Sequence, residues 1–325
     1  MNGKKKICVV IVTYNRKMYL EKLLDRLERI SLVSAIYVLD NHSSDGTYDY
    51  FSNVFSDNLE CMRVYIKAVN DKELFYFRNQ VNSGGAGGFH DVVQLAMKHK
   101  FDYLWIMDDD VLPSLDCLNN LRNGLDDEHK VVIPDRTDDL YSDTAVIKYS
   151  LYNPFKLTMG QRVTRVPCCD LKEPYIDVQA MAFEGPLIDT EIVKKVGYPD
   201  KNYFILFDDS DYCRRILQFT RVRLVKSAIL HKQIIPTNKK ELDWKEYYSY
   251  RNGFVFDRKY GKNGFVRHLR PFLIKSFSKW REGKRYGNIA RDLISVAYRD
   301  ALSNNMGKTL QPGKIKEYLY GEGND

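Results

Sequence analysis

The chain has 325 residues, 44% of them apolar, and carries a formal net charge of +7 at pH 7. This length can form one large hydrophobic core or two smaller ones, and the apolar content is that of an ordinary globular protein. No apolar stretch approaches the roughly 18 residues of a membrane-spanning helix, and the short apolar run 7–12 lacks the cleavage site of a signal peptide.

The six cysteines are scattered along the chain without a CxxC pair. This pattern indicates neither a zinc site nor a disulfide framework, and it is typical of a protein from a reducing cytosol. The excess of positive charge is compatible with a phosphorylated substrate, an anionic lipid surface or a nucleic acid as partner.

The first 40 residues have the pattern of a βαβ unit. Residues 7–13 (ICVVIVT) form a nearly continuous β-branched run, which is typical of a central strand in a parallel sheet. Residues 18–30 repeat leucines with the 3.6-residue period of a helix packed on a sheet, and residues 35–39 are predicted as the second strand. Because such connections are right-handed, we expect the sheet to begin parallel.

The second strand is followed by Asp40 and by the turn residues 42–47. A carboxylate at this place in an α/β fold can accept hydrogen bonds from the ribose hydroxyls or the base of a nucleoside. The alternative is an aspartate that only forms the turn.

A glycine-rich stretch, NSGGAGGF, occupies residues 82–89 after a short predicted strand at 74–77. Four glycines in five residues are costly in backbone entropy, which suggests close approach of the backbone to a ligand. A loop of this kind that opens a helix, here predicted over 90–99, can bind an anion through its free N–H groups. The alternative is a tight turn required only by packing.

An apolar run at 103–107 ends in three consecutive aspartates, Asp108, Asp109 and Asp110. The run predicts a buried strand, and ligands of open α/β sheets bind at the carboxyl ends of such strands. Close carboxylates repel one another unless a counter-charge is present, and a hard cation such as Mg²⁺ or Mn²⁺ also brings phosphate oxygens. The alternative is a solvated acidic turn or a helix N-terminus.

The middle of the chain is less regular. A helix is predicted at 115–125, a strand at 131–134 and a short helix at 190–196, while strand-like pieces at 145–151 and 175–178 suggest a small antiparallel sheet over the site.

An aromatic strand is predicted at 202–207, and it ends in Asp208 and Asp209 before another helix. One of these carboxylates can cap that helix, and one could act as a general base. A further strand-like run, 221–230, ends at His231, where a metal ligand or a structural histidine are both compatible with the pattern.

The C-terminal part is basic and aromatic, most strongly between residues 251 and 291. This composition fits a helix that lies on an anionic membrane surface. It fits equally a helix packed on the core with solvated cations on its outer face. Residues after 304 are predicted to form a frayed tail.

Several motifs occur in a fixed order: VVIVTYNR, VLDNHSSDGT, NSGGAGGF, WIMDDD, FDDSDYCRR and a later HK. As a set they resemble the family 2 glycosyltransferases of the GT-A fold, over roughly residues 6–260. Together with YYSYRN at 247–252, they look most like the bacterial galactofuranosyltransferases. Rhamnosyltransferases of the same family, which would use dTDP-rhamnose, are the close alternative.

The resemblance implies an α/β fold in which residues 1–240 form the GT-A catalytic domain. Its nucleotide-binding half would span about 1–134 and its acceptor half about 135–240. From the composition of the C-terminal part, we further expect residues 241–325 to form a helical, basic region for contact with a membrane surface or in an oligomer. The chain lacks room for the extra domains of the larger galactofuranan polymerases, so a single sugar addition is expected.

The implied reaction is an inverting, metal-dependent transfer of galactofuranose from UDP-galactofuranose to a lipid-linked glycan, in the synthesis of a cell-surface polysaccharide. The expected cofactor is Mn²⁺ or Mg²⁺, and the expected location is the cytoplasmic face of the cell membrane.

The resemblance also assigns roles to residues. It implies that Asp40, Thr13 and Arg16 lie at the uridine and that Asn82, Gly84 and Gly85 line the nucleotide and sugar. Asp108 and Asp109 would contact the donor, and Asp108, Asp110 and His231 would bind the metal. Asp209, with Asp208 beside it, would be the catalytic base.

A non-enzymatic alternative is a basic, aromatic nucleic-acid-binding protein. The acidic strand ends argue against it, because carboxylates repel phosphates when no metal is bound.

Overall fold

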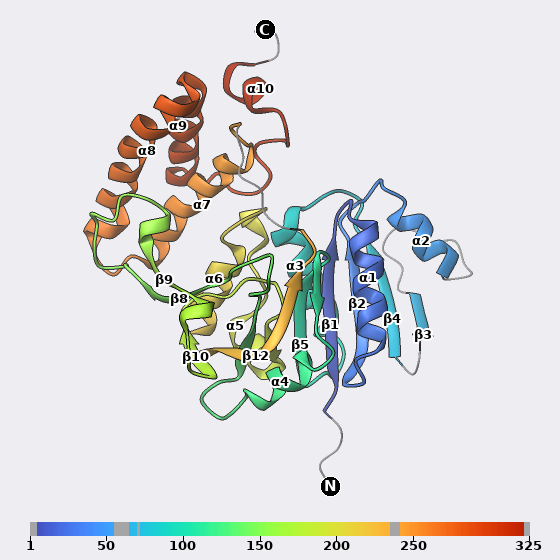
Figure 1. Ribbon diagram of the computed structural model, residues 1–325. Helices are drawn as coiled ribbons and strands as arrows, with labels where there is room; N and C mark the ends of the chain where they lie inside the picture. The colour runs from blue at the N-terminus through green and yellow to red at the C-terminus, as the bar shows by residue number, and fades with distance from the viewer. Residues whose placement is uncertain (1–4, 55–64, 70–71, 235–240, 322–325) are drawn as a thin grey trace. The chain divides into compact units, whose positions relative to one another are not determined.

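The computed structural model describes residues 5–54, 65–69, 72–234 and 241–321 (Figure 1). The chain divides into two compact units. The sheet unit comprises Met1–Ala145, Val166–Lys201 and Asp209–Ile235, and the helical unit comprises Val146–Arg165, Asn202–Asp208 and Pro236–Asp325. Cys61 and the domain boundary predicted near residue 240 lie outside the described residues.

A ten-stranded sheet forms the centre of the sheet unit. The strands lie in the order β10-β12-β7-β11-β5-β1-β2-β4-β3, and β6 pairs with the end of β12. Their bounds are β1 (Ile7–Thr13), β2 (Val33–Asp40), β3 (Tyr65–Val69), β4 (Lys72–Arg78), β5 (Tyr103–Asp108), β6 (Val111–Pro113), β7 (Val131–Asp135), β10 (Tyr175–Val178), β11 (Leu187–Asp189) and β12 (Val222–Lys232). Parallel pairs join β1 to β2 and β5, β2 to β4, and β7 to β12. The predicted α/β architecture with a mainly parallel sheet is confirmed.

The two faces of β1 meet different helices, because side chains alternate along a strand. Val9 and Ile11 pack in one core with the leucines of α1 (Lys17–Glu28). Val12 points to the opposite face, where α3 (Gly84–Ala96) packs so closely that a Cβ on Gly88 would lie 2.6 Å from Val12 Cγ1. Close packing therefore requires glycine at position 88.

Two details of the sheet unit differ from the predictions. The glycine-rich residues predicted as a loop form the first turns of α3, since the helix begins at Gly84 rather than near residue 90. The piece at 175–178 is not part of a separate small sheet. It is β10, the edge strand of the central sheet, because the outer edge of β12 offers backbone groups that pair antiparallel with it.

The remaining helices of the sheet unit flank the sheet. They are α2 (Thr47–Val54), α4 (Cys117–Asn123), α5 (Thr190–Val196) and α6 (Asp208–Ile216), whose first residue belongs to the helical unit. The helix α4 packs on β7 and β12, at the other end of the sheet from α3.

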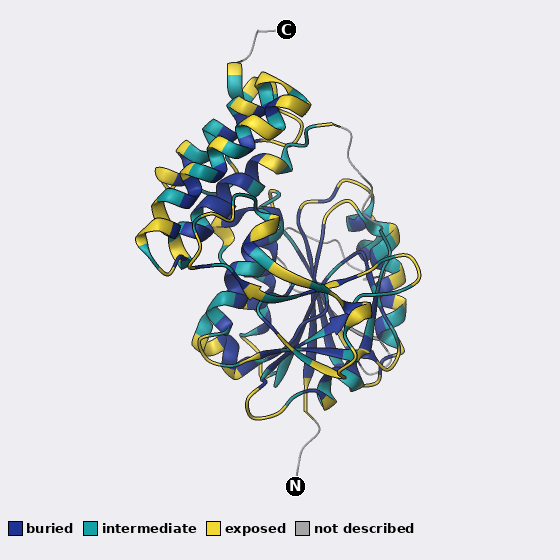
Figure 2. Cartoon of the chain, turned by 60° about the vertical axis from the view of Figure 1, so that its left-hand side comes forward, coloured by how far each residue is buried: buried dark blue, intermediate teal, exposed yellow. Residues whose placement is uncertain are grey.

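The helical unit has a core of aromatic and aliphatic side chains from several helices. These are α7 (Lys245–Tyr260), α8 (Arg270–Tyr286), α9 (Asn288–Leu302) and α10 (Ile315–Tyr320), with a π-helical turn at Phe265–Leu269 before α8. The strands β8 (Thr144–Tyr149) and β9 (Val163–Pro167) pair with each other as a two-stranded sheet. Buried residues line the inner sides of the helices, and exposed residues follow their outer sides (Figure 2).

The frayed tail predicted after residue 304 is wrong for the residues up to 321. Leu310 is fully buried, and its carbonyl accepts a hydrogen bond of 2.8 Å from the Tyr248 hydroxyl. The aromatic residues of α7 therefore hold this segment in the core. None of the helices among the described residues has the length and apolar character needed to cross a bilayer.

A buried ion triad connects three segments of the helical unit. The carboxylate of Asp257 on α7 binds Arg162 at 2.6 Å through one oxygen and Arg270 through the other. All three side chains are almost completely buried. Two buried guanidinium groups thus share one carboxylate, and loss of that carboxylate would leave both uncompensated.

We predict that Asp257→Asn lowers the free energy of unfolding by about 3–5 kcal/mol, because breaking a buried ion pair leaves an unpaired buried charge. Urea unfolding followed by far-UV circular dichroism measures this change. Glu317→Gln is the matched control, since its ion pair with Lys314 is exposed to solvent and should contribute at most about 0.5 kcal/mol. Equal unfolding midpoints for the two variants would contradict a structural role for the triad.

Candidate active site

Four strand ends place polar side chains in one row at the carboxyl edge of the parallel sheet. The registers pair Thr13 with Asp40 and Asp40 with Arg78, and they place Val12 opposite Asp108. Segments that are far apart in the sequence therefore meet where ligands of such sheets bind.

The middle aspartate of the acidic turn is held by several donors. Asp109 accepts hydrogen bonds from the Thr13 hydroxyl at 2.7 Å, from the Tyr14 N–H at 3.3 Å and from Arg16 at 3.1 Å. The same guanidinium nitrogen of Arg16 binds Asp110 at 2.7 Å. Burial raises the pKa of Asp109 to about 6 even though Arg16 and Thr13 oppose the shift. Asp109 therefore anchors the turn, while Arg16 supplies the counter-charge.

Asp108 has a different environment. No hydrogen bond or ion pair from any described residue reaches its carboxylate. Burial, followed by the negative charges of Glu184, Asp110 and Asp109, raises its pKa well above the usual range. A carboxylate in this position is stabilised by an added cation.

Glu184 is a further acidic residue near Asp108, and it was not predicted from the sequence. Its carboxylate binds Arg136 at 2.6 Å and Lys232 at 2.7 Å. Burial favours the neutral acid, but these two cations outweigh it and lower the pKa of Glu184. The one available signal in the sequence was a single charged residue within the apolar stretch 181–188.

Asp209 lies in the first turn of α6 and accepts a hydrogen bond from the Ser210 N–H. No described residue forms an ion pair with it. Burial, to which Glu184 adds and which Arg136 opposes, raises its pKa to about 6. Asp208, the first residue of α6, is 7% exposed.

The segment before Asp208 is not the aromatic strand that the sequence predicts. Residues 201–203 form a short 3₁₀ turn, and Phe204, Leu206 and Phe207 have φ values of 65°, 66° and 68°. Such left-handed conformations are unfavourable for bulky residues and persist only where surrounding contacts impose them.

The contacts that impose this conformation come from α7. The side-chain amide of Asn252 donates to the carbonyls of Tyr203, Ile205 and Leu206 at 2.8–3.1 Å, and Arg251 donates to Tyr203 at 3.0 Å. Both donors are fully buried. Residues 251–252 of the YYSYRN motif thus fix the segment that leads into the FDDSDY motif, a role that the sequence did not reveal.

The glycine-rich segment is tied to the end of β2 by Asn41. Its amide donates to the Gly84 carbonyl at 2.8 Å, and its carbonyl oxygen accepts from the Ser83 N–H at 3.0 Å. Asn82 accepts from the Gly84 N–H at 2.8 Å, and Gly84 has a positive φ of 75°. A Cβ on Gly85 would meet no atom within 4 Å, so packing does not explain this glycine. Open space in front of a helix N-terminus is suited to an anion.

Asp40 is fully buried, and its two carboxylate oxygens accept from the Ser43 N–H at 2.7 Å and from the Tyr76 hydroxyl at 2.6 Å. Arg78 lies 3.6 Å away. These contacts fix the loop after β2, and a direct contact of Asp40 with a nucleoside stays a prediction.

His231 lies on β12 opposite Leu112 of β6 and forms a 3.0 Å contact with Asp138. The structure does not gather its ring nitrogens with Asp108 and Asp110 into a closed cage. Among the described residues, the one trio of His, Cys, Asp or Glu ligand atoms within 4.8 Å of one another comprises Asp135, Asp143 and Cys168.

This compact trio is an ion-pair cluster rather than a favourable metal site. Lys226 binds Asp135, and Arg136 binds both oxygens of Asp143 at 2.7 and 2.9 Å. Burial, with the nearby carboxylates, raises the pKa of the Cys168 thiol to about 12, so the thiol is protonated. The cations already occupy the places that a metal would take.

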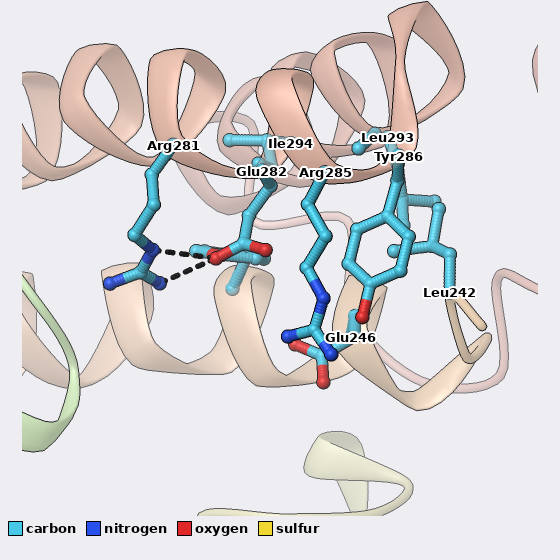
Figure 3. A pocket seen from close by; sticks show the side chains of 10 residues that line it. Leu242, Glu246, Arg281, Glu282, Arg285, Tyr286, Leu293 and Ile294 are labelled. Carbon is cyan, nitrogen blue, oxygen red and sulfur yellow. Dashed lines mark hydrogen bonds and ion pairs between the residues drawn. The ribbon is translucent and has the colours of Figure 1, made fainter. Parts of the chain in front are cut away.

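A cavity of about 190 Å³ lies within the helical unit, between α7, α8 and α9 (Figure 3). It is smaller than the ~300–1,000 Å³ of most ligand pockets. On its wall Arg281 pairs with Glu282 at 2.7 Å, and Arg285 points toward Glu246. These opposite charges balance each other, so the cavity is a weaker candidate than the acidic sheet edge.

Comparisons with known proteins were consistent with this geometry. The family model described as glycosyl transferase family 2 matches residues 8–176. The abequosyltransferase RfbV of Salmonella typhimurium is 34% identical over 133 residues, which are 40% of this chain and 35% of that protein. The chain thus matches about a third of the length of this relative.

Solved structures share the fold. TarS of S. aureus (residues 1–349) has a TM-score of 0.52 at 13% identity, with 92% of this chain and 82% of TarS covered. The mannosyltransferase PcManGT from Pyrobaculum calidifontis, in complex with GDP-Man and Mn²⁺, has a TM-score of 0.52 at 14% identity, with 93% and 76% covered. GalNAc-T7 with UDP, GalNAc and Mn²⁺ has a TM-score of 0.54 at 13% identity, with 88% and 59% covered. The GT-A fold is confirmed.

The raised pKa of Asp209 predicts a pH-dependent effect of Asp209→Asn on stability. The carboxyl group binds its proton more tightly in the folded chain than at its ordinary pKa of 3.8, and this contribution is lost as pH rises through about 6. Above pH 6, the asparagine variant should therefore be more stable than the wild type, by at most about 3 kcal/mol. Below about pH 4 the difference should vanish.

Thermal unfolding midpoints of both proteins across this pH range measure the effect. Asp127→Asn, at a fully exposed position, is the control and should not show it. A midpoint difference that stays constant from pH 4 to pH 8 would show that ionisation of Asp209 does not destabilise the folded chain.

Proposed function

The chain belongs to glycosyl transferase family 2, and on this premise we propose that it transfers galactofuranose from UDP-galactofuranose to a lipid-linked glycan with inversion at the anomeric carbon. The observation that carries the proposal is a pair of carboxylates, Asp108 and Asp209, on two different elements of the sheet unit, neither of which forms an ion pair with a residue that the structure describes. One suits a metal and the other a base, and an inverting transfer needs both.

Asp108 and Asp110 would hold the divalent ion at the carboxyl edge of the sheet. Carboxylate oxygens are ligands that Mg²⁺ and Mn²⁺ prefer, and such ions commonly use one or two protein carboxylates together with substrate phosphates. This kind of coordination fits a site where Asp108, Asp110 and His231 do not form a compact cluster of ligand atoms. His231, near the end of β12, would be a further ligand of the metal ion. When bound, the ion would supply positive charge to the diphosphate leaving group.

The protein itself would hold the donor from the other side. The first turn of α3 offers N–H groups next to the open space at Gly85, where the helix dipole favours an anion. Thr13 and Arg16 fix the acidic turn through Asp109, and Asn82 fixes the conformation at Gly84. Asp40 holds the loop at the end of β2, beside the place proposed for the uridine.

Asp209 would accept the proton of the acceptor hydroxyl as that oxygen attacks the anomeric carbon. With a pKa of about 6, it is ionised at neutral pH and more basic than an ordinary aspartate. The attack comes from the side opposite the departing diphosphate, so one base suffices and no covalent intermediate with the protein forms. Asp208, which opens the helix, would support the position of Asp209.

The identity of the donor sugar depends on the motifs shared with galactofuranosyltransferases. The nucleotides and Mn²⁺ bound by PcManGT and GalNAc-T7 support a metal-bound nucleotide sugar in general. The similarity to an abequosyltransferase supports a second candidate, in which another sugar such as rhamnose or abequose is transferred. A lipid-linked acceptor would place the enzyme at the inner face of the cell membrane.

A panel of nucleotide sugars tests the proposal. We expect release of UDP from UDP-galactofuranose in the presence of Mn²⁺ and an acceptor glycan, and loss of release after addition of EDTA. Donors of rhamnose and abequose test the second candidate. Turnover of only the rhamnose donor or only the abequose donor would assign the second candidate, and full activity in EDTA would remove the metal role.

Two variants separate binding from proton transfer. Asp209→Asn should lower kcat by about 10²–10⁴-fold, because general-base catalysis contributes an effect of this size. It should leave the Mn²⁺-dependent thermal shift by UDP intact. Asp108→Asn should weaken that thermal shift, since the metal would lose a ligand. Near-normal turnover of the Asp209 variant would exclude this residue as the base.

A further inference from the structure

One side of the helical unit exposes several large aromatic side chains. Phe265, Phe272 and Trp280 are 66%, 48% and 55% exposed. They are spaced by seven and eight residues, which is about two helical turns, so they lie on roughly one face of α8 and the π-helical turn before it. The opposite side of α8 buries Ile274 in the core of the helical unit. The helix is therefore packed on the core and also presents an aromatic outer face.

Cations accompany these rings. Lys275 lies 5.0 Å from the ring centre of Phe272, and Lys284 lies 4.0 Å from that of Trp280. Residues 262–281 contain no acidic residue, while Lys262, Arg267 and Lys279 add further positive charge. The outer face combines apolar rings with one sign of charge.

A loop of the same unit extends this surface. Tyr152 and Phe155 are each 70% exposed. The Lys262 N–H, which lies between α7 and the π-helical turn, donates to the Leu151 carbonyl at 2.9 Å. Arg270, the first residue of α8, donates to the Asn153 carbonyl at 3.1 Å, so the loop is fixed to both segments. In Figure 1 this green segment runs beside the start of α8. We call this surface the aromatic-basic face; it comprises Tyr152, Phe155, Phe265, Phe272 and Trp280 with Lys262, Arg267, Lys275, Lys279 and Lys284.

We propose that the aromatic-basic face binds the surface of a bilayer that contains anionic lipids. Aromatic rings partition into the interfacial region, and neighbouring lysines attract acidic headgroups while their stems remain along the apolar surface. The lipid-linked acceptor of the proposed function gives this contact its purpose, and the inference rests on the proposed function in that respect alone.

A second copy of the chain fits this face less well. A symmetric contact would place the same lysines against one another, and like charges across an interface are costly. Lysine is also depleted in protein interfaces, whereas it is favoured on helices at anionic membranes. A bilayer surface satisfies both the rings and the charges.

Co-sedimentation of the full chain with vesicles tests the proposal. We expect binding to vesicles of equal parts phosphatidylcholine and phosphatidylglycerol, and little binding to phosphatidylcholine alone. Phe272→Ala combined with Trp280→Ala should reduce the partition coefficient at least about tenfold. Lys275→Gln, Lys279→Gln and Lys284→Gln should reduce the partition coefficient about fivefold for each cation removed.

Matched controls come from the sheet unit. Phe219→Ala removes another exposed aromatic ring, and Lys98→Gln with Lys100→Gln removes other exposed cations. Both controls should bind vesicles as the wild type does. Unchanged binding of the Phe272 and Trp280 variant would overturn the proposal, as would a dimer in light scattering that this variant converts to a monomer. Tight binding of an oligonucleotide in place of vesicles would also overturn it.

Transfer to a soluble acceptor without lipid separates the two proposals. The variants of the aromatic-basic face should keep this activity, because their substitutions lie outside the acidic sheet edge. Vesicle binding without any transfer would support the role of the aromatic-basic face and reject the proposed function. Transfer without vesicle binding would support the proposed function and reject the role of the aromatic-basic face.

Discussion

The site depends on an imbalance of charge at the carboxyl edge of the sheet. Three consecutive aspartates begin at the last residue of β5, and Arg16 pairs with two of them. Asp108 forms no ion pair with any described residue, and the negative charges of Glu184, Asp110 and Asp109 act on it while Arg16 opposes them. Burial raises the free-energy cost of ionising Asp108, and this carboxylate lies at the place where α/β sheets bind ligands. A divalent ion held against a diphosphate would relieve that cost.

The path of the chain to Asp209, the second carboxylate of the proposed site, depends on a different constraint. The chain enters α6 through residues that adopt left-handed conformations, and such a path is stable only when its carbonyls are held. Asn252 uses its amide group to hold three of them, and a buried Arg251 holds one of the same carbonyls. Aspartate cannot replace Asn252 in this role, because an ionised carboxylate has no hydrogen to donate.

The sequence predicted most of the central sheet because its strands are apolar runs that end in polar residues. β1 and α5 were predicted with their exact bounds, and β5 was predicted to within one residue. The start of α3 was wrong, because glycine is a poor helix former and gives no periodic signal, yet position 88 needs glycine to pack against β1. The segment at 202–207 was wrong for another reason. Its aromatic residues favour a strand locally, and contacts from α7, more than 40 positions away, override that preference.

The same limit applies to the site. Asp108 and Asp110 were predicted as metal ligands because three adjacent acids are a visible pattern, whereas Arg136, Glu184 and Lys232 are isolated residues from three separate segments. Only the fold brings them together, at distances of 2.6–2.9 Å. Glu184 raises the pKa of both Asp108 and Asp209, so the two carboxylates share one electrostatic neighbour. Arg136 and Lys232 keep Glu184 ionised, and they thereby maintain the negative charge that acts on both. This one charge therefore acts on the proposed metal ligand and on the proposed base together, and a cation bound at the sheet edge would offset it.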